Sequence, residues 1–172
     1  RRRPGRAWQP RADAMSASFQ AEFHRIQQAL KKGLFRKVDH GGSAEELLEL
    51  GAALRREGNA PHAALCLMAA AQCHRALEQP AVAAHHDAQA GQLLWREQLQ
   101  LLARVDDAVF RDLVPEATAC YLGAIHVHLA HEHRALAGTL YAEMADFLWA
   151  LGNSGRRAPR CRLCAGGAVS AP

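Results

Sequence analysis

The chain has 172 residues, of which 49% are hydrophobic, and its formal net charge is +4. This length suits one domain, and the apolar fraction supports a packed core rather than global disorder. Alanine fills 36 positions, whereas Val, Ile and Thr together fill 11. Because alanine favours helices and β-branched residues favour strands, this composition argues against sandwiches, barrels and Rossmann-type sheets. The sequence predicts an all-α fold.

The excess of positive charge lies at the two ends of the chain. Five arginines fall within residues 1–11 and four within residues 156–162, whereas residues 12–155 hold 12 Lys+Arg against 17 Asp+Glu. A nucleic-acid-binding domain carries its positive charge on the folded surface, so we do not expect nucleic acid as a partner. Attachment to RNA or to a membrane through the Arg-rich ends stays open as an alternative.

The same two ends lack hydrophobic periodicity and are rich in Arg, Pro and Gly. We therefore predict a disordered lead over residues 1–15, a helical-repeat domain over residues 16–152 and a disordered tail over residues 153–172. The chain begins with Arg rather than Met, so we expect a fragment or a conceptual translation, with Met15 as a candidate initiator.

The first predicted helix runs from about Ser16 to Phe35. Its apolar stripe has spacings of four, three and four residues and consists of Phe19, Phe23, Ile26 and Leu30. The segment Ser43-Ala44-Glu45-Glu46 has the pattern of a capping box that opens a second helix, and Gly58-Asn59 closes it.

Proline and glycine punctuate the rest of the chain. Pro61 stands in the first turn of a third helix that ends near Glu78. The remaining predicted helices span about 81–104, 115–130 and 135–152, with a loop over residues 105–114. Because the connections are short, antiparallel neighbours are the expected arrangement.

A degenerate repeat favours a tetratricopeptide-like α-solenoid over a closed bundle. Small residues and leucines recur at repeat-like positions in Ala44, Leu47, Leu50, Gly51, Leu54, Ala63, Leu67 and Ala70. A second, weaker occurrence lies 72 residues later and comprises Ala119, Leu122, Gly123, Ala135 and Ala142. In this pattern small residues let the two helices of a pair approach closely.

Two constellations resemble metal sites without meeting their spacing. The cluster His126, His128, His131 and His133 places only the second and third imidazoles on one helix face, so we interpret it as a polar helix end. Cys161 and Cys164 form a CxxC with no second pair nearby. We therefore predict no metal ion and no cofactor.

The cysteines and the hydropathy pattern indicate an intracellular protein. Cys66 and Cys73 are seven residues apart on one predicted helix, about 10 Å by the helical rise, which is too far for a disulfide. Cys120 lies on another apolar stretch, so all three are predicted to be buried thiols. The longest uncharged run, 58–74, contains polar residues and is not a membrane span, so we expect no transmembrane segment.

No arrangement of residues suits an enzyme. The sequence has no nucleophile elbow, no P-loop and no Gly-rich dinucleotide motif. Adjacent acidic pairs such as Asp106-Asp107 point in different directions on a helix. What remains is surface for protein partners.

Aromatic and basic side chains are the candidates for that surface. Most aromatic residues are expected in the core, but one or two anchor interfaces in many proteins. The basic end of the first helix suits an acidic partner or an anionic membrane. The predicted protein-binding residues are Phe19, Phe23, Lys31, Lys32, Arg36, Lys37, Trp95 and Trp149.

The segment from Phe19 to Lys37, with its aromatic-x3-aromatic start and its LKK-x-LF-RK ending, resembles the first helix of the 40-kDa huntingtin-associated (factor VIII intron 22) protein family. The resemblance covers roughly residues 19–152. Further matching positions are Leu50-Gly51, Leu54-Arg55, Pro61, Cys66, Cys73, Arg96-Glu97, Leu122-Gly123-Ala124 and His128-Leu129.

This resemblance implies a tetratricopeptide-like α-solenoid, distantly similar to the soluble vesicle-fusion attachment proteins. It implies a non-enzymatic adaptor that binds and stabilises huntingtin and links it to early endosomes and vesicle motility, with an early-endosomal Rab GTPase as a further partner. The expected location is the cytoplasm, early endosomes and the nucleus. A generic vesicle-trafficking adaptor of the same fold is the alternative.

Overall fold

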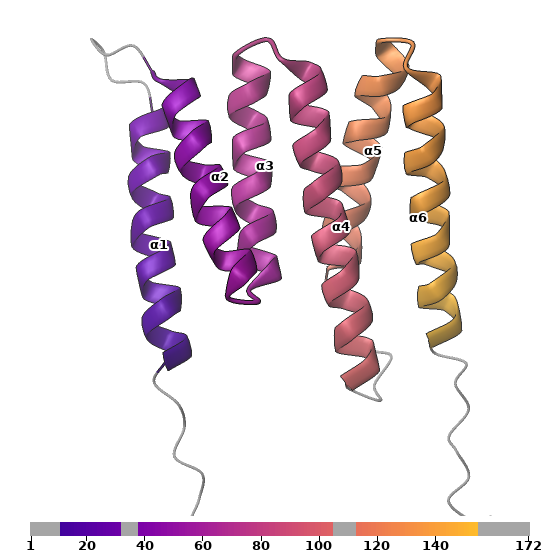
Figure 1. Cartoon of the computed structure of the whole chain (residues 1–172), viewed down its shortest axis with the longest axis horizontal. Helices are drawn as coiled ribbons and strands as arrows, with labels where there is room; N and C mark the ends of the chain where they lie inside the picture. Colours follow the sequence, from indigo (N-terminus) through magenta and orange to yellow (C-terminus); the bar gives the residue numbers. More distant parts are fainter. Residues whose placement is uncertain (1–10, 32–37, 105–112, 155–172) are drawn as a thin grey trace, which may run out of the picture. The chain divides into compact units, whose positions relative to one another are not determined.

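The structure, a computed structural model, describes residues 11–31, 38–104 and 113–154 (Figure 1). These residues form the helices α1 (Arg11–Leu30), α2 (His40–Arg56), α3 (Ala60–Ala76), α4 (Pro80–Arg104), α5 (Val114–Ala130) and α6 (Arg134–Ser154). The described ranges contain helices and no strand, which confirms the predicted all-α class. The chain divides into two compact units, residues 1–86 and residues 87–172, with the boundary inside α4.

The first helix starts and stops earlier than the periodicity predicts. It begins at Arg11, inside the segment expected to be disordered, and ends at Leu30 rather than Phe35. Alanine at positions 12, 14 and 17 explains the earlier start, because good helix formers extend a helix beyond its packed stripe.

The second helix also begins before its predicted cap. The N-cap is Asp39, whose carboxylate accepts a hydrogen bond from the Gly42 N–H at 2.9 Å. Ser43, the predicted cap, is instead buried within the first turns of α2. The capping-box prediction is therefore wrong, since Asp39 lies upstream and already caps the orphan N–H groups of the helix.

The same three-residue turn joins α2 to α3, α3 to α4 and α5 to α6. Its middle residue has a left-handed backbone, with φ of 78° at Gly58, 58° at Glu78 and 59° at Glu132. The N–H of the next residue donates to the carbonyl five positions earlier, as in a Schellman motif, and its own carbonyl accepts the first bond of the following helix. One residue thus closes one helix and opens the next, which turns the chain back on itself.

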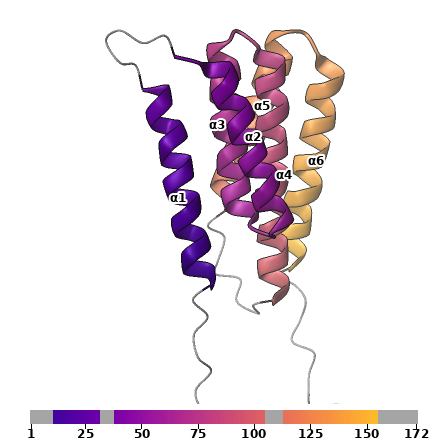
Figure 2. The same cartoon turned by 60° about the vertical axis from the view of Figure 1, so that its left-hand side comes forward.

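Unit 1 has a core of small side chains. The α2–α3 pair runs antiparallel, and the two helices are neighbours that lie side by side in Figure 1 and overlap in the turned view of Figure 2. A Cβ added at Gly51 would lie 3.1 Å from Cys66 Cβ, so this glycine allows the close approach that the repeat pattern predicts. The buried residues of the core cluster are Ile26, Ala44, Leu47, Ala69, Ala70 and Cys73.

Unit 2 has an aromatic core. The Trp95 indole stacks on the Phe147 ring at a centroid distance of 5.7 Å, and the buried Tyr121 ring lies 6.3 Å from the same ring. A Cβ at Gly91 would be 2.8 Å from the Tyr121 ring, so the glycine makes room for that ring. The Gln98 side chain accepts a hydrogen bond from the N–H of Leu113, the residue that precedes α5.

None of the described helices is long and apolar enough to cross a lipid bilayer.

Candidate protein-binding surfaces

The two aromatic residues predicted on α1 hold this helix in place. Phe19 is buried, with its ring centroid 4.4 Å from the His62 ring and 5.3 Å from the Phe23 ring. Phe23 is half-buried and packs against the core of unit 1. Most of the Phe19 surface is therefore used within the unit, and Phe23 keeps a partly exposed edge.

The basic cluster is described only at its first member. Lys31 is exposed and follows directly after the last residue of α1. Lys32, Arg36 and Lys37 lie outside the described residues, as do the arginines of residues 1–6 and 156–162. An exposed lysine at a helix C-terminus complements the helix dipole and leaves its ammonium group available to a partner.

The two predicted tryptophans occupy opposite environments. Trp95 is fully buried in the aromatic core of unit 2, so it belongs to the core and not to a binding surface. Trp149 on α6 is 74% exposed. Of the two, only Trp149 is placed where a partner can reach it.

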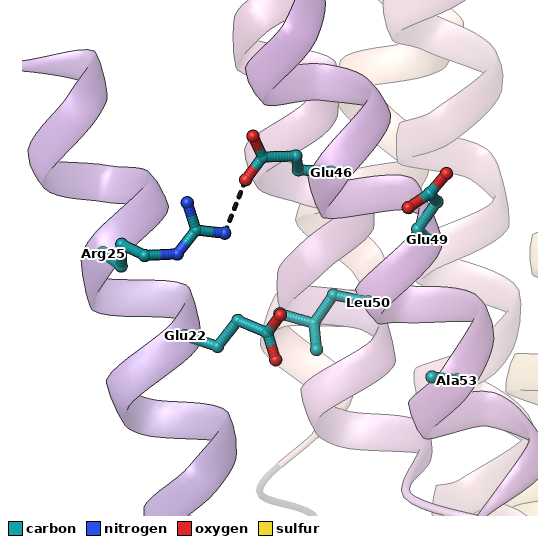
Figure 3. Close-up of a pocket in the computed structure, with 6 residues that line it drawn as sticks. All are labelled: Glu22, Arg25, Glu46, Glu49, Leu50 and Ala53. Atoms are coloured by element: carbon teal, nitrogen blue, oxygen red, sulfur yellow. Dashed lines mark hydrogen bonds and ion pairs between the residues drawn. The ribbon is translucent and has the colours of Figure 1, made fainter.

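A pocket of about 320 Å³ lies between α1 and α2 (Figure 3). Its lining combines the apolar side chains of Leu50 and Ala53 with carboxylates from both helices. The Arg25 guanidinium donates to Glu46 Oε2 at 2.6 Å, with both side chains at least half exposed. Such an exposed pair contributes only about 0–1 kcal/mol. The six lining residues are Glu22, Arg25, Glu46, Glu49, Leu50 and Ala53.

The histidine cluster lies at the α5–α6 turn. The His133 ring centroid is 5.9 Å from that of His128 and 6.3 Å from that of His131. Burial lowers the pKa of His128, and the charges of His133 and His131 lower it further. In the part of the chain that the structure describes, no group of three His, Cys, Asp or Glu side chains is placed to hold a metal ion.

The cysteine side chains of the described helices are buried thiols at positions 66, 73 and 120. Burial, together with the charge of Glu22, raises the pKa of Cys66 to about 12, and burial also raises the pKa of Cys73. A thiol with a raised pKa is a poor nucleophile, because the thiolate is the reactive form. Cys161 and Cys164 lie outside the described residues.

The sequence is similar to that of curated proteins from two mammals. The chain is 29% identical over 149 residues to the 40-kDa huntingtin-associated protein of Mus musculus, and 28% identical over 149 residues to the protein of that name from Rattus norvegicus. Each match covers 86% of this chain and 38% of the relative. The chain is distantly related to the 40-kDa huntingtin-associated protein. It spans about two fifths of the length of these curated relatives. No family model and no solved structure matches.

This relationship agrees with the resemblance predicted from the first helix, and it extends over most of the chain. The second occurrence of the repeat pattern does not place its small residues between two helices as predicted. In the described structure Ala119, Ala135 and Ala142 are exposed, so they do not form the contact between α5 and α6. Instead α5 buries Ala117, Cys120, Tyr121, Ala124, Ile125 and His128.

One surface was missed by reasoning from the sequence. Tyr141 and Leu148, each 44% exposed, lie on the same side of α6 as Trp149, whereas Leu136, which is 51% exposed, lies on another side of the helix. The signal was present in the sequence, since α6 has more large apolar residues than one buried stripe can hold. Periodicity alone does not show which of them the rest of the unit covers.

Proposed function

We propose that the chain is a non-enzymatic helical-repeat adaptor that binds and stabilises huntingtin. The observation that carries this proposal is the distant relationship over 149 residues to a protein named for its association with huntingtin. The chain matches only part of that relative, so huntingtin as a partner of this chain is an inference from the related part.

The helix pairs support an adaptor of the tetratricopeptide-like solenoid type. The same turn joins three pairs of the described helices, with a left-handed residue and the same hydrogen bonds each time. A close-approach glycine at Gly51 suits the repeat pattern. Helical repeats of this kind bind protein partners along helix faces.

A direct test uses the full chain immobilised on a resin and purified huntingtin in solution. We expect huntingtin to be retained at moderate ionic strength and eluted by high salt, because rim charges are screened by salt. Absence of retention at low salt would contradict the proposal. A lysate capture read by mass spectrometry then distinguishes huntingtin from other trafficking factors, whose retention in its place would favour the generic adaptor.

Lys31, together with the basic residues of segment 32–37, is the part of the chain that we expect to contact huntingtin. Charge reversal of Lys31, Lys32, Arg36 and Lys37 to Glu should reduce retention at least tenfold. The control reverses Arg55 and Arg56, which are exposed cations in the last turn of α2, and it is compared with reversal of Lys31 and Lys32 alone, so that both variants carry the same change of charge. Equal loss in both variants would indicate a general charge effect and not a defined contact.

We further propose that the chain acts in the cytoplasm, on early endosomes and in the nucleus, with an early-endosomal Rab GTPase as a second partner. Huntingtin would then be the link between the chain and vesicle motility. In cells, a fluorescent fusion of the full chain should overlap with an early-endosome marker. Overlap that persists unchanged in cells lacking huntingtin would contradict this order of assembly.

A further inference from the structure

An exposed strip runs along the whole of α6. It consists of residues at spacings of four, four, three, four and three, which keeps them on one face of a helix. All of them are exposed: Arg134, Gly138, Ala142, Ala145, Trp149 and Gly152. Tyr141 and Leu148 flank the strip on one side. We refer to these six residues as the α6 strip.

The α6 strip is not part of the core of unit 2. That core uses another face of the helix, where Ala137 and Leu151 are buried and the Phe147 ring stacks on Trp95. A Cβ added at Gly138 or Gly152 would meet nothing within 4 Å. The strip therefore presents one large apolar side chain, Trp149, among glycine and alanine residues, with Arg134 at one end. A tryptophan that is 74% exposed at such a place is typical of an interface anchor.

The geometry points to a second copy of this chain as the partner, with the two α6 helices packed antiparallel along their strips. The twofold axis then crosses each helix at the level midway between Glu143 and Met144. In that register the Trp149 of each copy lies over the Gly138 of the other. Ala142 of one copy meets Ala145 of the other beside the axis, which lets the helices approach closely. A twofold contact requires a surface that is complementary to itself, and the alternation of large and small residues meets this requirement.

The charges on α6 fit the same orientation. Within the described residues, the last turn of α6 contains no basic residue. The antiparallel arrangement brings Arg134 of one copy to the carbonyl end of α6 in the other, where a cation is favourable. The two Arg134 side chains stand at opposite ends of the pair, about 28 Å apart by the helical rise. The strip carries no carboxylate, and the Glu143 carboxylate already accepts a hydrogen bond from Gln92 at 2.7 Å within unit 2.

The first test is the oligomeric state of the full chain, measured by sedimentation equilibrium over a wide concentration range. We expect a reversible dimer, together with a blue shift of the tryptophan fluorescence and protection from acrylamide as the dimer forms, and both changes should be absent from the Trp149→Ala variant. Trp149→Ala should weaken the dimer at least about 30-fold, which is typical of an interface anchor. The control Leu65→Ala removes another exposed apolar residue, on α3, and should leave the dimer unchanged. A chain that stays monomeric, or a dimer that Trp149→Ala leaves intact, would overturn the proposal.

A second pair of variants tests the register without depending on loss of an anchor. Gly138→Trp alone places two tryptophans opposite each other and should abolish the dimer, although Trp is a better helix former than Gly. Adding Trp149→Ala exchanges the large and small positions and should restore the dimer. Circular dichroism checks that each variant keeps its helices. Failure of the double variant to dimerise when both proteins are folded would overturn the antiparallel register. This pairing goes beyond the proposed binding of huntingtin and is measured without it.

Discussion

The α2–α3 and α5–α6 pairs have the same turn and very different packing. In both pairs, one residue closes the first helix and opens the second, with matching hydrogen bonds. Yet α3 buries seven residues around much of its circumference, whereas α6 buries only Ala137 and Leu151 among its described side chains. The turn thus determines that two helices pair, and the small residues between them determine how much surface the pair buries.

The largest expected contrast comes from truncating one leucine in each pair. Leu47→Ala should destabilise the protein by about 2–5 kcal/mol, because this fully buried side chain leaves a cavity in the core of unit 1. Leu136→Ala on the half-exposed face of α6 should change stability by less than about 0.5 kcal/mol. Urea denaturation followed by circular dichroism measures both. Equal losses would show that the two pairs are packed alike.

A glycine in each pair should respond to the same substitution with opposite sign. Gly51→Leu should destabilise by about 1–3 kcal/mol, since the new side chain meets Cys66 and forces α2 and α3 apart. Gly138→Leu should stabilise the monomer by somewhat under 1 kcal/mol through helix propensity, because open space surrounds it. Thermal unfolding at a protein concentration low enough to keep the wild type monomeric compares the two. A rise in the thermal stability of Gly51→Leu would contradict the expected opposite signs at the two glycines.

The turns give a smaller and again opposite pair of effects. Gly58→Ala should destabilise by about 1 kcal/mol, because a side chain is disfavoured at a φ of 78°. Glu132→Gly should stabilise by about 0.5–1 kcal/mol, since it removes that penalty while making the unfolded chain more flexible. Differential scanning calorimetry measures the two shifts in Tm. Shifts of the same sign would mean that the two turns are not equivalent.

The smallest effect is a dependence on pH confined to the α5–α6 pair. The pKa of His128 is lowered in the folded protein from its ordinary value of 6.5, so the folded state binds a proton less readily than the unfolded chain. The corresponding stability is present above pH 6.5 and is lost as the pH falls below it. His128→Leu should therefore flatten the decline in Tm between about pH 7 and pH 5. The exposed neighbour His126→Gln provides the control, and an unchanged decline in the His128 variant would refute this account.

Much of the fold could be predicted because its signals are local. Pro61, Pro80 and Pro115 mark helix starts to within a residue or two, and the Gly58-Asn59 pair marks the end of α2. The start of α2 could not be predicted in the same way. Asp39 and Ser43 both have the chemistry of a cap, and only the path of the backbone decides which carboxylate or hydroxyl meets the free N–H groups.

The candidate surfaces were harder to predict than the helices. Trp95 and Trp149 both stand in apolar helical stretches, and sequence alone assigns them the same two possible roles. Their environments differ because Gly91 makes room for the Tyr121 ring and Phe147 stacks on Trp95, which are contacts between residues far apart in the chain. Exposure depends on such long-range contacts, so it could not be predicted from periodicity.

The buried thiols make it possible to measure how fast the units on either side of the boundary inside α4 open. Cys66 and Cys73 lie in one compact unit and Cys120 in the other, so each unit contains its own reporter of transient opening. Pulses of a thiol reagent on a Cys161→Ser/Cys164→Ser variant would give a separate opening rate for each half of the chain. Identical labelling rates would mean that the two units unfold together, with α4 coupling them. Faster labelling of Cys120 would mean that the C-terminal unit opens independently while the N-terminal unit stays folded.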